Sequence, residues 1–85
     1  MEKIKRDSND NEVDFIIEGS GELLAVEVKS KEVVAARDLK GLIRFGKDYP
    51  KAKLICLCTT ERAYDIEGIE VLPWKLFFEK RYGLK

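Results

Sequence analysis

Twelve residues separate Asp14 from Glu27, and Lys29 lies two positions after Glu27. Since side chains alternate between the faces of a strand, an antiparallel hairpin would place all three on one face. Two carboxylates that converge there form a hard-oxygen site suited to Mg²⁺ or Mn²⁺, which the backbone carbonyl of Val28 could complete. The Lys29 ammonium could orient a metal-bound water or neutralise charge on a phosphate. This combination is the one that phosphodiester hydrolysis requires.

Each of these residues also has an ordinary structural interpretation. Asp14 and Glu27 could be solvent-exposed carboxylates on the wet face of an antiparallel hairpin. Lys29 could pair with either of them, which stabilises an exposed pair by well under about 1 kcal/mol. Glu12 could be a further metal carboxylate or an exposed charge at the end of a strand.

The hairpin itself is indicated by alternation of apolar and polar residues in residues 12–18 and 22–29. Residues 19–21, Gly-Ser-Gly, predict the tight turn between them. The pattern assigns one set of side chains to the core-facing side: Val13, Phe15, Ile17, Leu24, Val26 and Val28. The candidate site residues would then lie on the other side, away from the core.

The rest of the chain predicts a small α/β domain with a mixed sheet. We expect a helix over about residues 34–48, stopped by Pro50, and then a doubly buried parallel strand over 53–59. Two short edge segments follow, at 63–66 and 69–72, and a C-terminal helix over 74–82 with Pro73 at its first position and Gly83 as its stop. Residues 1–85 form a single domain, in which residues 1–11 are a loose tail or a short strand.

A stripe of basic side chains follows the first predicted helix: Arg37, Lys40, Arg44, Lys47 and Lys51. Their spacing of three and four residues places them on the side opposite the apolar stripe. Residues 31–53 carry seven basic and three acidic side chains. The ordinary interpretation is a solvated helix face, and the functional one is contact with the phosphates of DNA through Arg37, Lys40, Arg44 and Lys47.

Other chemistry is excluded by composition. The chain has no histidine, which rules out Ser/His and Cys/His catalytic pairs and histidine-containing zinc sites within it. Cys56 and Cys58 are expected on one face of a strand as small buried side chains, with a redox pair or half of a shared metal site as the alternative. There is no P-loop, no apolar run of the roughly 18 residues that a membrane span needs, and no signal-peptide pattern, so we expect a soluble, cytoplasmic protein without ATPase activity of its own.

Asp14, followed after twelve residues by Glu27-Val28-Lys29, resembles the PD-(D/E)XK nuclease superfamily, the fold of restriction endonucleases and archaeal Holliday junction resolvases. Four segments look like the C-terminal nuclease-like domain of archaeal and bacterial AAA+ ATPases: residues 12–17, 24–30, 37–42 and 69–74. The resemblance covers roughly residues 11–79.

The resemblance implies a restriction-endonuclease-like core, which in the superfamily has the element order αβββαβ, and an Mg²⁺- or Mn²⁺-dependent DNA endonuclease or exonuclease. Asp14, Glu27 and the carbonyl of Val28 would hold the metal, and Lys29 would be the catalytic cation. The alternatives are a catalytically silent structural or oligomerisation module of an AAA+ ATPase, and a non-catalytic nucleic-acid binder. Because the related resolvases are dimers, we also expect a homodimer, formed through an uncovered sheet edge or through Trp74, Phe77 and Phe78.

Overall fold

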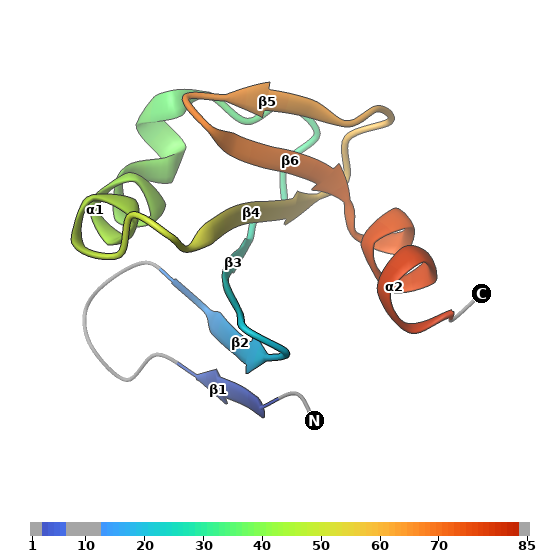
Figure 1. Ribbon diagram of the computed structural model, residues 1–85. Helices are drawn as coiled ribbons and strands as arrows, with labels where there is room; N and C mark the ends of the chain where they lie inside the picture. The colour runs from blue at the N-terminus through green and yellow to red at the C-terminus, as the bar shows by residue number, and fades with distance from the viewer. Residues whose placement is uncertain (1–2, 7–12, 84–85) are drawn as a thin grey trace.

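A computed structural model describes residues 3–6 and 13–83 of the chain and gives the α/β architecture that the sequence predicts (Figure 1). Within these residues a mixed sheet has six strands in the order β1-β2-β3-β4-β6-β5. The elements in chain order are β1 (Lys3–Arg6), β2 (Phe15–Gly19), β3 (Glu22–Val28), the 3₁₀ turn η1 (Ala36–Leu39), α1 (Lys40–Asp48), β4 (Lys53–Cys58), β5 (Tyr64–Ile66), β6 (Ile69–Pro73) and α2 (Trp74–Tyr82). No helix among the described residues is long and apolar enough to cross a membrane.

The first three strands form an antiparallel meander. β2 and β3 pair with Phe15 opposite Val26, and the turn between them consists of Ser20 and Gly21, with φ angles of 52° and 77°. Two central residues with positive φ make the tight hairpin turn that suits the twist of a sheet. The predicted hairpin is therefore confirmed. β1 pairs with β2, so residues 3–6 form a strand, whereas residues 7–12 lie outside the described part of the chain.

Beyond the meander the sheet becomes parallel. The chain crosses from β3 through η1 and α1 to β4, and β4 pairs in parallel with both β3 and β6. The expectation that residues 69–72 form an edge segment is wrong, because β6 lies between β4 and β5. Its side chains explain this position: Ile69 and Val71 are buried on one face and Leu72 on the other. Only β5 occupies the edge on this side.

Two apolar clusters fill the two faces of the sheet. On one face Leu42 and Phe45 of α1 pack with Ala25, Cys56 and the other buried residues of that side. On the opposite face Phe77 of α2 packs with Leu24 and the alternate residues of β4. Because each face has its own helix, the side of β3 that carries Ala25 and Glu27 is buried against α1, and it is not the wet face that one interpretation of the sequence assumed.

The hairpin's predicted core-facing set needs two corrections. Val13 is buried on the α1 side, whereas Phe15 and Ile17 lie on the α2 side, so the alternation breaks at Asp14. Phe15 and Val28 are 40% and 47% exposed, since α2 contacts β4 and β6 and leaves their end of the sheet open.

The predicted helix over residues 34–48 begins later than expected. The Asp38 side chain accepts a hydrogen bond from the Ala35 backbone N–H at 3.0 Å, and the turn that it closes is 3₁₀. The first turn of the predicted helix is thus a 3₁₀ turn capped by Asp38, as is frequent at the start of an α-helix, and α1 itself runs over Lys40–Asp48. Gly46 lets this helix approach β4 closely, because a Cβ atom there would lie 2.7 Å from Cδ1 of Leu54.

The C-terminal helix has its predicted bounds. Gly83 has a φ of 67°, and its N–H donates to the carbonyl of Glu79, as a left-handed helix stop does. Pro73 is the last residue of β6 in extended conformation, so it caps α2 and is not its first residue.

Candidate functional site

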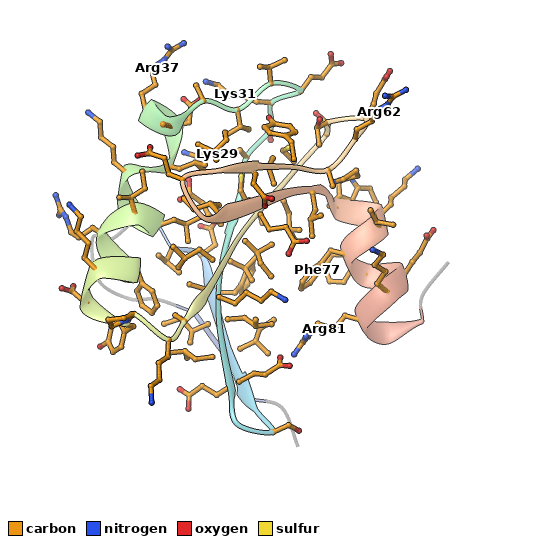
Figure 2. The ribbon with its side chains drawn as sticks, turned by 45° about the horizontal axis from the view of Figure 1, so that its top comes forward. Lys29, Lys31, Arg37, Arg62, Phe77 and Arg81 are labelled. Atoms are coloured by element: carbon orange, nitrogen blue, oxygen red, sulfur yellow. The ribbon has the colours of Figure 1, made fainter. Side chains whose placement is uncertain are left out.

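The candidate site lies where β3 ends, beside the parallel strand β4. Lys29 follows β3 directly, and Figure 2 shows it near Lys31 and Arg37 at one end of the molecule. In open α/β sheets, ligands bind outside the carboxyl ends of parallel strands. The candidate site residues therefore lie at the end of the sheet where ligands bind in folds of this kind.

The Asp14 carboxylate is hydrogen-bonded to the backbone at the end of β3. Its Oδ2 accepts a hydrogen bond from the Val28 backbone N–H at 2.7 Å, and its own N–H donates to the carbonyl of Val26 at 3.0 Å. The Val28 N–H thus donates to a side-chain carboxylate, where a regular ladder would supply a backbone carbonyl of the neighbouring strand. In an extended residue the N–H and C=O groups point toward the same neighbouring strand. The Val28 carbonyl therefore lies on the side of β3 where the Asp14 carboxylate lies.

Glu27 is the buried charge of the site. It is 2% exposed, and its Oε2 lies 2.9 Å from Nζ of Lys29. The interpretation of Glu27 as a solvent-exposed carboxylate is therefore wrong. The expected pairing of Lys29 with a neighbouring carboxylate is present, but it runs along one strand and not across the hairpin.

The structure brings Asp14, Glu27, Val28 and Lys29 to one end of β3 through these contacts. It does not place the two carboxylates together on an open face, because Asp14 lies at the strand edge and Glu27 is buried. Among the described residues, no group of three or more His, Cys, Asp or Glu side chains is arranged to hold a metal. Glu12, the further candidate carboxylate, lies outside the described residues.

The two cysteines are buried on the α1 side of β4, as expected for small apolar side chains. Cys56 pairs with Glu27 across the parallel ladder. Burial raises the pKa of Cys56 to about 12, with the neighbouring Cys58 and Glu27 adding to the rise. Cys56 is therefore a protonated thiol at neutral pH, and the thiolate that metal binding or disulfide exchange needs is disfavoured.

The basic residues lie on the outer side of α1. Lys40, Arg44 and Lys47 are exposed on the helix, opposite the buried Leu42 and Phe45. Arg37 on η1 and Lys51 after the helix are also exposed. The predicted stripe therefore exists as a solvent-facing surface.

The connection that follows β3 is held by residues that the sequence analysis did not single out. The Tyr64 hydroxyl accepts from the Val34 N–H at 3.0 Å and donates to the Val34 carbonyl at 3.2 Å. The Thr59 N–H donates to the carbonyl of Lys31 at 3.1 Å. A single tyrosine in a short edge strand gives no sequence signal for this role, because the contact spans thirty residues.

Asp38 also holds the segment between β3 and α1 in place, through two hydrogen bonds. Its Oδ1 lies 2.8 Å from Nζ of Lys31, and that hydrogen bond, together with the one from the Ala35 N–H, holds the pKa of Asp38 below its usual value. An acidic residue three positions after the start of a helical turn is a known capping signal, so this role could have been found in the sequence.

The family comparison covers most of these elements. Residues 4–77 match the model of a family described as a domain of unknown function (DUF4143). No curated protein and no solved structure matches the chain. Because the matched segment runs from β1 into α2 and spans most of the sequence, the chain belongs to the DUF4143 family.

Proposed function

We propose that this domain is a metal-dependent nuclease-like module that binds DNA and hydrolyses its phosphodiester bonds. Asp14, Glu27 and the carbonyl of Val28 hold Mg²⁺ or Mn²⁺, and Lys29 is the catalytic cation. The exposed basic residues of η1 and α1 contact the DNA backbone: Arg37, Lys40, Arg44 and Lys47.

The observation that carries the proposal is the buried carboxylate of Glu27. Removing a charged group from water costs roughly several kcal/mol, and an ion pair offsets only part of this cost. Apart from its ion-pair partner Lys29, Glu27 lies beside small apolar and thiol side chains, among them Ala25 and Cys56, so packing with these would favour an apolar residue here. A costly group retained at the carboxyl end of a parallel strand is typical of a functional site.

The element order supports the same function. β1, β2, β3, α1 and β4 follow one another as in the βββαβ part of the superfamily core that the sequence resembles. Asp14 precedes the second of these strands, and Glu27 lies near the end of the third. The chain therefore presents the two halves of its motif on adjacent strands.

Two of the proposed donors, the Asp14 carboxylate and the Val28 carbonyl, suit a hard divalent ion. Mg²⁺ takes one or two carboxylates and keeps several waters, and the Asp14 carboxylate and Val28 carbonyl lie on the same side of β3. When bound, the ion would act as a Lewis acid and acidify a water molecule. Lys29 holds the Glu27 carboxylate in one orientation, and its partly exposed ammonium can neutralise charge on a phosphate at the same edge.

The second candidate function is a catalytically silent structural or oligomerisation module of an AAA+ ATPase. The observation that favours it is the exposure of large apolar side chains at one end of the sheet, where Phe15, Val28 and Trp74 are 40–47% exposed. An apolar surface of this kind often marks a contact with another protein. Metal binding separates the two functions, since the silent module requires none.

A thermal melt with and without millimolar Mn²⁺ tests the proposal. Metal that binds the folded state should stabilise it by about 2.7 kcal/mol at a hundredfold excess over the dissociation constant. Asp14→Asn should abolish this rise while leaving the metal-free protein intact, because the amide oxygen can still accept from the Val28 N–H. Asp65→Asn, which neutralises an exposed carboxylate on β5, is the matched control and should keep the rise. Identical melting curves for the unaltered protein with and without metal would contradict the proposal.

A further inference from the structure

A hollow lies between α2 and the sheet at the end where the parallel strands β3, β4 and β6 begin. Its volume is about 310 Å³, within the range of roughly 300–1,000 Å³ that small-molecule pockets have. Figure 2 shows Phe77 and Arg81 extending from α2 toward the sheet. The buried apolar part of the lining consists of Leu24, Ile55, Leu72 and Phe77. The charged part consists of Glu22, Lys53, Glu70, Lys80 and Arg81.

Two of these charged residues occupy positions where packing would favour apolar side chains. Lys53 is on β4 and Glu70 is on β6, and both strands lie inside the sheet. Because helices cover both faces of parallel strands in such a position, these strands are usually apolar throughout. Lys53 precedes Ile55 by two residues and Glu70 precedes Leu72 by two, so both charges point to the α2 face. Residues that break a local packing rule are typical of functional sites.

The charges of the lining do not balance. Nη2 of Arg81 lies 3.4 Å from Oε2 of Glu22, and the charges of these two groups compensate each other. Lys53, Lys80 and Glu70 form no ion pair within the residues that the structure describes. Two ammonium groups therefore face one carboxylate, and the lining carries an excess positive charge. The complementary ligand has one anionic group and an apolar body.

From these observations we propose that the hollow binds a small organic acid. Its apolar body packs on Leu24, Ile55 and Leu72, and its anionic group pairs with the ammonium groups of Lys53 and Lys80. A hydrogen bond between two charged groups is roughly twice as strong as a neutral one, so the anionic group selects the ligand. The candidate nuclease site lies at the opposite end of β3, and this inference therefore does not depend on the nuclease function.

The probe for this site is 3-phenylpropionate, which joins a single ring to one carboxylate. Titration without metal or DNA should shift the amide NMR signals of Leu24, Ile55 and Leu72. The signals of Val28 and Trp74, which line a separate apolar hollow on the same face, should stay unchanged. The alcohol 3-phenylpropan-1-ol has the same ring and chain, and it should bind about tenfold more weakly because it lacks the charge. The absence of any shift, shifts at Val28 and Trp74 alone, or equal affinity for acid and alcohol would overturn the proposal.

Substitutions in the lining test the assigned charges. Lys53→Gln and Lys80→Gln keep long polar side chains at exposed positions and should each weaken binding of the acid about tenfold. Lys75→Gln is the matched control, because Lys75 is exposed on the same helix but does not line the hollow. Glu70→Gln should tighten binding, since it removes a carboxylate that repels the ligand. Unchanged affinity in both Lys53→Gln and Lys80→Gln, or weaker binding in Glu70→Gln, would overturn the proposal.

Discussion

Glu27 and Lys29, two positions apart on one strand, form an ion pair of 2.9 Å in which the carboxylate is buried and the ammonium reaches solvent. The Lys29 ammonium therefore stabilises the buried Glu27 carboxylate and also lies at the end of β3 where the proposed phosphate would bind. Stability and the proposed chemistry are coupled through this one pair.

The Lys29→Ala variant should be destabilised by about 1–3 kcal/mol, since it leaves a buried carboxylate without the partner that Lys29 supplies. Glu27→Gln in the same chain should recover part of this loss, because the buried charge is then gone. Denaturant unfolding of the two single variants and the double variant measures the coupling. Strictly additive losses would contradict an energetic role for the pair.

Charge reversal at Arg44 and Lys47 should flatten the salt dependence of DNA binding by about two units of slope, because two phosphate contacts are lost. The unfolding free energy should change by no more than about 0.5 kcal/mol, since both side chains are exposed. Reversal at Lys53 and Lys80, which line the hollow beneath α2, changes the net charge equally and is the control. Equal effects of the two pairs would indicate a general charge effect and not a binding face.

Tyr64→Phe should destabilise the fold by about 1–3 kcal/mol, because it removes the hydroxyl that serves both polar groups of the Val34 backbone. Amide hydrogen exchange at Val34 should accelerate in the variant. Tyr49→Phe, at an exposed ring, should change stability by less than about 0.5 kcal/mol. Unchanged exchange at Val34 would show that the hydroxyl does not hold this segment.

Asp38 should make stability depend on pH in the acid range. Its pKa in the folded state is lowered from 3.8 by the hydrogen bond with Lys31, so its stabilising effect is present above that value and is lost as the pH falls through the folded-state pKa. Asp38→Asn keeps an acceptor for the Ala35 N–H and removes the charge. The stability difference between wild type and variant should therefore shrink as the pH is lowered below 3.8, as acid titration followed by circular dichroism would reveal. A constant difference would exclude the charge as its cause.

Self-association is expected to produce a homodimer. β1 and β5 occupy the two edges of the sheet, and an open edge is a template for pairing with another chain. Sedimentation at micromolar concentration should give about twice the chain mass of 9.8 kDa. A monomer throughout that range would contradict the expectation.

Much of the fold was determined by the sequence alone, because the responsible signals are local. Alternating apolar and polar residues and a Gly-Ser-Gly turn predicted the hairpin. A run of consecutive apolar residues, which suits a strand buried on both faces, predicted β4, and Pro73 and Gly83 marked the ends of α2. The hairpin also sufficed to bring Asp14 to the end of β3. These features depend on backbone dihedral preferences and on the two-residue alternation of side chains in a strand, both of which are set by residues close together in the sequence.

Only the tertiary structure decided which groups are buried. Alternation separates the two faces of a strand, but it does not state that α1 covers the face of Glu27 while α2 leaves Phe15 and Val28 partly open. The interior position of β6 and the bond between Tyr64 and Val34 likewise join segments distant in the chain. Burial is a property of all the elements packed together, and for that reason the charge of Glu27 could be found in the sequence and its enclosure could not.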